Sequence, residues 1–415
     1  MSSTPDKPLP QSALEGVRVL DLSRVLAGPW ATQALADLGA EVIKIERPGI
    51  GDDTRSWGPP FLKTHDGEKT DAAYFLATNR NKRSVTVDFT QSEGQQLLHA
   101  LVPHCHIVVE NFKTGGLAKY GLDFATLSAI NPALVYCSVT GFGQTGPYAE
   151  RAGYDYLIQA MGGLMSVTGQ PDGQPGAEPM KVGVAVVDLF TGMYAVTGIL
   201  AALRHAERTG QGQHIDVALF DVQTAMLANQ AMNWFVGGVA PGRLGNAHPN
   251  IVPYQVFGVA DGFLVLAVGN DGQYRSFCRV AGVEALGTDP LYATNASRVA
   301  NRAALTALIA PIMASRSQAD WIKSLEEAGV PCGPINTIDQ VFASENAMAR
   351  GLSVTLERED VGPVTLTPHP VKFSATPARM DTAPPQLGIH TATVLQSLLG
   401  TTSAQLEDLR TKGII

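Results

Sequence analysis

One acidic residue, Asp188, interrupts the longest apolar run of the chain, VGVAVVDLFTGMYAVTGILAAL. The run is long enough for a membrane span, for which about 18 apolar residues suffice, but an acid inside such a segment is costly in lipid. We therefore predict a buried strand end at residues 184–187 that turns into a buried helix from Asp188 to about Ala206. A carboxylate there could be a nucleophile or general base, or it could only cap the helix.

The predicted helix has two different faces. A core-facing stripe is formed by Leu189, Met193, Val196, Leu200 and Leu203. A second face of small residues would let another backbone come close; it consists of Gly192, Ala195, Gly198 and Ala202. Asp188 lies at the positive end of the helix dipole, which favours a negative charge, so we expect it to be ionised.

Strands and helices alternate around this element. Predicted strands cover residues 17–22, 41–46, 84–88, 106–110, 134–139 and 214–219. Predicted helices cover residues 30–38, 92–101, 124–130 and 222–235. This alternation is typical of a parallel sheet with right-handed crossovers, so the expected fold class is α/β, with a Rossmann-like large domain.

Ligands of such sheets bind outside the carboxyl ends of the strands, which draws attention to the loops there. Basic residues occur at Arg47 and in NRNKRS, and glycines in ENFKTGG and GFGQTGP, so these loops could receive phosphates. The first turn reads SRVLAGP and lacks G-x-G-x-x-G, which disfavours a nicotinamide-binding oxidoreductase without removing it as an alternative. Histidines are scattered, and we expect no metal site.

Composition restricts the partners and the compartment. The 415 residues include 30 basic and 38 acidic ones, a formal net charge of −8, which gives no general attraction to nucleic acid or anionic lipid. The four scattered cysteines lack a C-x-x-C pair and are expected to be free thiols. The polar start, residues 1–14, is expected to be a disordered leader of a cytoplasmic protein. The segment GGVAPGRLGNAHPNIVP indicates a boundary before a smaller α/β domain.

An ordered series of motifs now resembles a known family. LEGVRVLDLSRVLAGPWATQALADLGAEVIKIERPG, NRNKRSVTVDF, VENFKTGGLAKYG, SVTGFGQTGP, RAGYDYLIQAMGG, VVDLFTGMYAVTG, GNAHPNIVPYQ and LGIHT together are similar to the class III CoA-transferases. The resemblance runs from about residue 14 to the C-terminus and is strongest to the dicarboxylate branch. It implies transfer of CoA from an acyl-CoA, such as succinyl-CoA, to a small acid such as glutarate.

The resemblance also implies an organisation and a site. The large domain would comprise residues 15–235 and 342–415, the small domain residues 236–341, and two subunits would interlock as a homodimer. Asp188 would be the nucleophile, and coenzyme A would be a substrate without any permanently bound cofactor. The CoA contacts carried over from the family are Val25, Ala27, Arg47, Val87, Asp88, Phe89, Thr90, Asn111, Phe112 and Lys119. Arg80 is the candidate partner of a distal substrate carboxylate.

The nearest alternative is a 2-methylacyl-CoA racemase, which shares the fold and the acid at position 188. Such enzymes have a histidine where this chain has Tyr154, immediately before Asp155. A phenol with a pKa near ~10 is a poor base for an α-proton, so the sequence favours transfer over racemisation.

Overall fold

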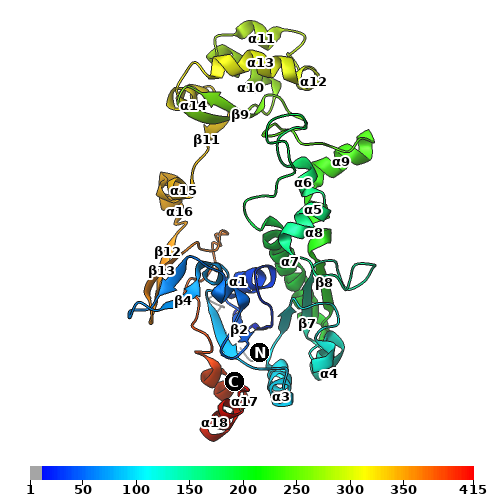
Figure 1. The fold of residues 1–415 in the computed structure, drawn as a ribbon, viewed down its shortest axis with the longest axis vertical. Helices are drawn as coiled ribbons and strands as arrows, with labels where there is room; N and C mark the ends of the chain where they lie inside the picture. The colour runs from blue at the N-terminus through cyan, green and yellow to red at the C-terminus, as the bar shows by residue number, and fades with distance from the viewer. Residues whose placement is uncertain (1–11) are drawn as a thin grey trace, which may run out of the picture. The chain divides into compact units, whose positions relative to one another are not determined.

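The computed structural model describes residues 12–415, and this part of the chain divides into two compact units (Figure 1). The first unit comprises the chain up to Gly163 together with Val182–Ala228 and Asn346–Ile415, and the second comprises Leu164–Lys181 and Asn229–Glu345. The boundaries predicted at 235/236 and 341/342 differ from these by seven and four residues, and the excursion at 164–181 was not predicted. Most of the predicted leader falls outside the described residues, and Ser12 and Leu14 are buried.

Within the described residues, the first unit is built on a six-stranded sheet of order β5-β2-β1-β6-β7-β8 in which every neighbouring pair is parallel. The strands are β1 (Arg18–Asp21), β2 (Glu41–Glu46), β5 (Lys82–Thr86), β6 (Ile107–Glu110), β7 (Val135–Thr140) and β8 (His214–Ala218). Counted along the chain, this is the order 3-2-1-4-5-6 of a doubly wound dinucleotide-binding fold. The predicted Rossmann-like parallel sheet is confirmed.

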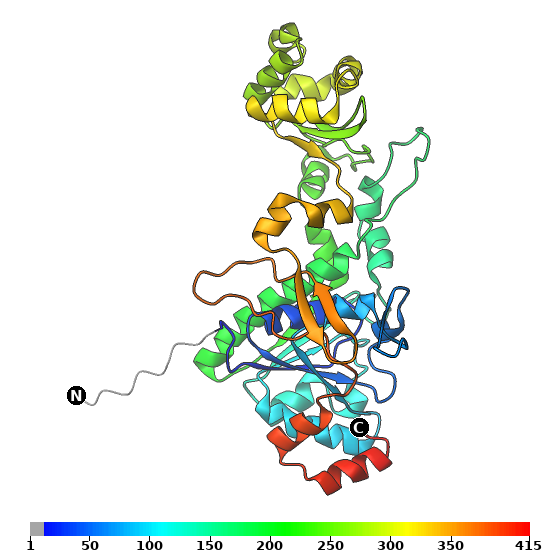
Figure 2. The same cartoon turned by 90° about the vertical axis from the view of Figure 1, so that its left-hand side faces the viewer.

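Helices cover both faces of the sheet (Figure 2). One face carries α1 (Ala27–Asp37), α5 (Asp155–Met161), α7 (Val186–Thr209) and α8 (Leu219–Met226). The opposite face carries α3 (Ser92–Leu101), α4 (Phe124–Ile130), α17 (Thr391–Leu399) and α18 (Ser403–Thr411), so the C-terminal helices complete a core begun by the N-terminal strands. Alternation along β1 supplies both cores, because Val19 faces the first set of helices and Leu20 the second.

Helix α7 differs from its prediction at its start. The strand expected at residues 184–187 is wrong, since the helix already begins at Val186. The backbone there is satisfied by a side chain of α5 and not by a neighbouring strand: the amide of Val187 donates to Asp155 Oδ1 at 2.8 Å. Asp188 is therefore the third residue of the helix and lies inside its first turn.

The core-facing stripe predicted on α7 is confirmed in part, because Val196 and Leu203 are buried in the core. Met193, predicted to face the core, is 41% exposed, whereas Ala195 and Ala202 of the small face are buried. A methyl group at Gly192 would lie 2.8 Å from the carbonyl oxygen of Ala27, so the predicted close approach is made by α1. By length and composition α7 is the one described helix that could cross a membrane, yet here its small face is part of the sheet's core.

The rest of the first unit consists of short elements. They are η1 (Asp53–Ser56), β3 (Phe61–Lys63), β4 (Lys69–Ala72), α2 (Ala73–Leu76), η2 (Val102–His104), η3 (Ala118–Tyr120), β12 (Val354–Arg358) and β13 (Gly362–Leu366). The β12–β13 hairpin, predicted from its sequence, packs Val364 and Leu366 on Phe75 of α2.

The second unit contains a three-stranded antiparallel sheet of order β11-β10-β9. Its strands are β9 (Tyr254–Val259), β10 (Gly262–Ala267) and β11 (Cys332–Pro334). Its helices are α6 (Leu164–Val167), α10 (Asp271–Val280), α11 (Glu284–Thr288), α12 (Asn295–Ala300), α13 (Arg302–Met313), α14 (Gln318–Glu327) and α15 (Ile338–Ala343). Two helices, α9 (Ala228–Gly237) and α16 (Glu345–Arg350), begin at the unit boundaries. The helix predicted over 222–235 is instead broken into α8 and α9, because Ala228 has a φ of 43°.

Candidate active site

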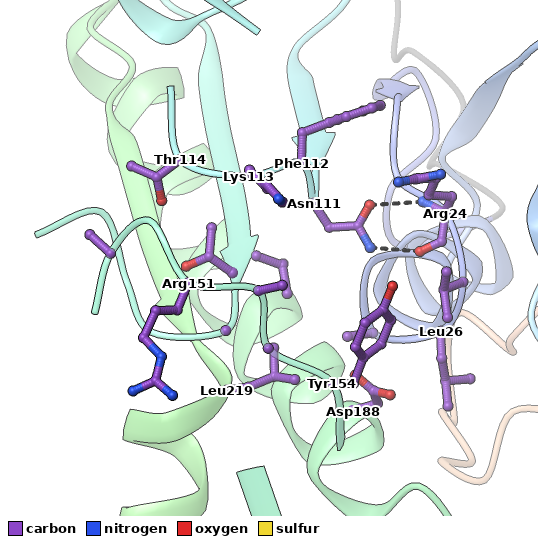
Figure 3. A pocket seen from close by; sticks show the side chains of 18 residues that line it. Arg24, Leu26, Asn111, Phe112, Lys113, Thr114, Arg151, Tyr154, Asp188 and Leu219 are labelled. Atoms are coloured by element: carbon purple, nitrogen blue, oxygen red, sulfur yellow. Dashed lines mark hydrogen bonds between the residues drawn. The ribbon is translucent and has the colours of Figure 1, made fainter. Parts of the chain in front are cut away.

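A cavity of about 160 Å³ lies at the carboxyl ends of β1, β6 and β7 in the first unit (Figure 3). Strands β1 and β6 are neighbours at which the order of the sheet reverses, which is where ligands of such folds bind. The cavity brings together five of the residues predicted from the sequence, namely Val25, Ala27, Asn111, Phe112 and Asp188. Arg24, Lys113, Thr140, Arg151 and Tyr154 also line it.

Asp188 enters this cavity from the first turn of α7 (Figure 3). No residue that the structure describes donates a hydrogen bond to its carboxylate. Burial raises the pKa of Asp188 to about 7, and the negative charge of Asp155 contributes in the same direction. The expectation that the helix dipole would keep this acid fully ionised is therefore wrong, because desolvation and a like charge outweigh the dipole at this position.

Asp155 performs the capping role that the sequence left open for Asp188. Its Oδ1 atom accepts the amide of Val187 at 2.8 Å and that of Asp188 at 3.4 Å, while Ala185 at the N-cap contributes no side-chain bond. Its Oδ2 atom accepts Nε2 of Gln159 at 2.7 Å, and Gln159 in turn accepts the amide of Val182 at 2.9 Å. The nucleophile candidate is thus placed by its neighbour and keeps its own carboxylate free.

The loop after β1 forms the opposite wall. Val25 has a φ of 72°, a conformation that is strained for a β-branched residue. The amide of Val25 donates to Asp52, which in turn accepts Lys44 Nζ at 2.8 Å. Lys44 also donates to the carbonyl of Ser23 at 2.9 Å, so one buried ion pair holds both sides of the loop.

A second contact joins this loop to the one after β6. The amide of Arg24 donates to Asn111 Oδ1 at 2.9 Å, and Asn111 Nδ2 donates to the carbonyl of Arg24 at 2.6 Å (Figure 3). The guanidinium of Arg24 also lies 5.5 Å from the centre of the Phe112 ring.

The remaining predicted CoA contacts do not line the cavity, but Phe89 and Lys119 are connected to it through a series of aromatic contacts. Phe112 packs edge-on against Phe89, with ring centres 5.8 Å apart, and Phe89 packs against Tyr120. The ammonium of Lys119 lies over the Tyr120 ring at 4.7 Å. Aromatic contacts therefore connect the cavity to a cation at the far end.

The segment from Val87 to Thr90 follows β5 at the same edge of the sheet. Val87 is buried and donates its amide to Glu46, whereas the side chain of Asp88 accepts the amide and hydroxyl of Thr90. Burial of Asp88 is outweighed by hydrogen bonds from Thr90 and Gln91 and by the charge of Arg47, so its pKa lies below the usual range. Arg47 thus lies close to this segment.

Arg80 is placed differently from its hypothesised role. Its guanidinium is buried and bonds both carboxylate oxygens of Asp37, and it does not line the cavity. Lys82 of the same NRNKRS motif is buried as well and pairs with Asp21 at 3.1 Å. The geometry therefore does not support Arg80 as the partner of a substrate carboxylate, because its charge is already neutralised.

Some lining residues were not predicted from the sequence. Arg24 and Lys113 belong to SRVLAGP and ENFKTGG, two loops that were predicted to lie at strand ends. Their positions in these loops could therefore have identified them as candidates. Tyr154 and Arg151 reach the cavity because Gly141 and Gly153 come so close that a methyl group on Gly141 would lie 2.6 Å from Gly153 Cα. Such a contact between distant segments leaves no trace in local sequence periodicity.

The fold and the site define an α/β protein with a free carboxylate in a cavity at the switch point of its sheet. The model of CoA-transferase family III matches residues 14–391. The chain belongs to this family and is a CoA-transferase, as its motifs suggested.

Several named proteins are similar to this chain over most of its length. The succinate–glutarate CoA-transferase of Agrobacterium fabrum is 54% identical over 95% of this chain and 97% of its own length. The succinyl-CoA:glutarate CoA-transferase of Homo sapiens is 40% identical over 97% of this chain and 90% of its own. The crystal structure of a CaiB/BaiF family protein from Brucella suis superposes with a TM-score of 0.82 at 51% identity, covering 93% of this chain and 99% of that one. These matches favour the transferase over the racemase and oxidoreductase alternatives.

Proposed function

We propose that this enzyme transfers CoA from succinyl-CoA to a small dicarboxylate such as glutarate, with Asp188 as the nucleophile. The free carboxylate of Asp188, facing a cavity at the switch point, is the observation that carries the proposal. The names of the Agrobacterium fabrum and Homo sapiens relatives support the choice of substrates.

The first half-reaction moves the acyl group and then CoA onto the enzyme. An oxygen of Asp188 attacks the thioester carbonyl of succinyl-CoA, the C–S bond breaks, and CoA leaves as a thiolate, which gives a mixed anhydride. The thiolate then attacks the aspartyl carbonyl of this anhydride, and succinate departs with the electrons of the broken C–O bond. Asp188 is left as a CoA thioester.

The second half-reaction runs in the opposite direction with the other acid. A carboxylate of glutarate attacks the aspartyl thioester, which releases the CoA thiolate and forms a second anhydride. The thiolate attacks the glutaryl carbonyl, so glutaryl-CoA forms and the carboxylate of Asp188 is restored. The two half-reactions together exchange only the CoA group and involve no oxidation or reduction, so the proposed reaction needs no permanently bound cofactor.

Remote contacts with CoA would contribute the energy for the uphill anhydride step. We propose that the thioester lies beside Val25, Ala27 and Asn111, and that the nucleotide end extends along Phe112 and Phe89 toward the cations Arg47 and Lys119. The aromatic contacts between these residues support one continuous binding surface. Val87 to Thr90, at the end of β5, would border it.

We also propose a homodimer of interlocked subunits, each with a large CoA-binding domain and a small domain, located in the cytoplasm. Large apolar side chains exposed on α7 support an interface on the first unit; Phe190 is 47% exposed and Tyr194 51%. On α9 of the second unit, Trp234 is 50% exposed and Phe235 68%. A chain that leaves such surfaces open usually covers them with a partner.

A panel of acids tests the proposed substrates. Succinyl-CoA is incubated with the enzyme and either glutarate, other dicarboxylates or monocarboxylates of equal length, and new acyl-CoA is measured. Dicarboxylates should react at least about tenfold faster, because a charged group of the site that loses its substrate carboxylate costs about 1.4 kcal/mol or more. Equal rates for monocarboxylates would contradict the dicarboxylate assignment, and deuterium incorporation at the α-carbon would support the racemase instead.

A further inference from the structure

The carboxylate of Asp155 contacts the backbone at the start of the helix that carries Asp188. Asp155 belongs to the first turn of α5 and Asp188 to the first turn of α7. Oδ1 of Asp155 accepts the backbone amides of Val187 and Asp188 itself, so its negative charge is held against the backbone that carries the nucleophile. The second oxygen is held by Gln159, which is fully buried, so this carboxylate has little freedom to turn away.

The surroundings of Asp188 contain little to offset this second negative charge. Burial and the charges of Asp188, Asp155 and Asp52 raise the pKa of Tyr74 in α2, so this tyrosine is a neutral phenol and contributes no positive charge. Arg24, Lys113 and Arg151 line the cavity, yet none of these three cations forms an ion pair with Asp188. The guanidinium of Arg24 instead pairs with the carboxylate of Asp53 at 2.9 Å.

We propose that Asp155 is a positioning residue for the transfer reaction: its carboxylate holds the first turn of α7, and its charge makes Asp188 a more reactive nucleophile. This inference rests on the proposed role of Asp188. Two like charges at one helix start repel each other while both are ionised. The repulsion disappears when Asp188 is acylated, because the anhydride and the aspartyl thioester are neutral.

The charge balance of the first step shows where the gain arises. The Asp188 oxygen forms a bond to the thioester carbon, the C–S bond breaks, and the negative charge leaves with the CoA sulfur. The charge therefore moves away from Asp155 during the step. A carboxylate that its neighbour makes more basic is also a stronger nucleophile. The same change keeps the carboxylate protonated, and therefore unreactive, up to a higher pH.

Asp155→Asn separates the two parts of the proposal, because the amide keeps an oxygen that can accept the Val187 amide but carries no charge. Asp155→Ser removes the same charge with a different acceptor, and Asp155→Glu retains the charge. Asp289→Asn is the matched control, since Asp289 also accepts a backbone amide, that of Leu291 at 2.9 Å, but lies in the second unit. Thermal unfolding identifies which variants are folded.

The measurement is single-turnover acylation of the enzyme by succinyl-CoA without acceptor, between about pH 5 and pH 9. In the wild type and in Asp289→Asn, the rate should rise with pH around a midpoint near 7. In Asp155→Asn and Asp155→Ser the midpoint should move to lower pH, and the plateau rate should fall by roughly threefold for each unit of that shift. Asp155→Glu should restore the wild-type midpoint.

Two results would overturn different parts of the account. A wild-type midpoint and plateau in either folded, uncharged variant would refute the role of Asp155 while leaving Asp188 as the nucleophile. If no acyl group is found on Asp188 of the wild type, the proposed function itself fails, whatever the variants do.

Discussion

Lys44 Nζ lies 2.8 Å from Oδ2 of Asp52, and neither side chain is exposed to solvent. Through this pair the middle of β2 holds the loop that forms one wall of the candidate active site, because Lys44 also bonds Ser23 and Asp52 bonds Val25. A buried pair is expensive to break, since the remaining charge has no water to solvate it.

The variant Asp52→Asn should therefore destabilise the protein by about 3–5 kcal/mol, the usual result of leaving one member of a buried ion pair. Arg24→Gln is the control, because the Arg24–Asp53 pair is exposed and such pairs contribute about 0–1 kcal/mol. Urea unfolding of both variants checks this. Equal losses in the free energy of unfolding would show that the buried Lys44–Asp52 pair contributes no more than an exposed pair.

The same pair predicts a sensitivity to acid. Burial of Asp52 is outweighed by Lys44 and by hydrogen bonds from Thr54, so its pKa is lowered to about 2. A depressed carboxylate pKa stabilises the folded state above the unfolded value of ~3.9, and this contribution is lost as the pH falls toward the folded value. Acid unfolding of Asp52→Asn should be shallower than that of the wild type between those values; parallel curves would exclude this source of acid sensitivity.

Replacing Val25 with glycine should leave the stability of the fold unchanged but weaken the binding of succinyl-CoA. At a φ of 72° glycine removes strain of about 1–3 kcal/mol, which offsets its greater freedom in the unfolded chain. We expect Val25→Gly to keep the melting temperature while raising KM for succinyl-CoA several-fold, because the loop becomes looser. Ala228→Gly, at the other apolar position of positive φ, should leave KM unchanged. A lower melting temperature without a change in KM would contradict a role in binding.

Asp188→Asn should remove a pH-dependent loss of stability. The folded pKa of about 7 exceeds the unfolded value, so the folded state binds more protons, and wild-type stability falls as the pH rises through this interval. The variant should melt at a higher temperature than the wild type at pH 8 and at the same temperature below about pH 4. A variant that melts lower at pH 8 would show that the carboxylate is a structural group.

The proposed dimer predicts the effect of charges on its surface. Phe190→Glu on α7 and Trp234→Glu on α9 replace side chains that are about half exposed in one chain. Each should shift the sedimentation coefficient from that of a dimer toward that of a monomer without lowering solubility, while Ile50→Glu, at an exposed position in the loop after β2, should not. A monomeric wild type would contradict the assembly.

The sequence was sufficient for features that depend on neighbouring residues. Periodicity and strand–helix alternation predicted the parallel sheet, and a lone acid in an apolar run singled out Asp188. Features that depend on pairs far apart in the chain were not predicted: the cap that Asp155 provides to Val187, and the hydrogen bonds between Arg24 and Asn111. Arg80 illustrates the same limit, because a basic loop in the sequence became a buried pair with Asp37 once the fold joined α1 to the start of β5.

The covalent intermediate on Asp188 tests the central claim most directly. Enzyme incubated with succinyl-CoA is quenched with hydroxylamine and digested, and the peptide containing Asp188 is examined by mass spectrometry. The account predicts conversion of Asp188 to its hydroxamate only when succinyl-CoA is present, and none in Asp188→Asn, whose transfer activity should fall by at least about 10³-fold. An unlabelled Asp188 during continued turnover, or an Asp188→Asn enzyme with wild-type activity, would contradict it.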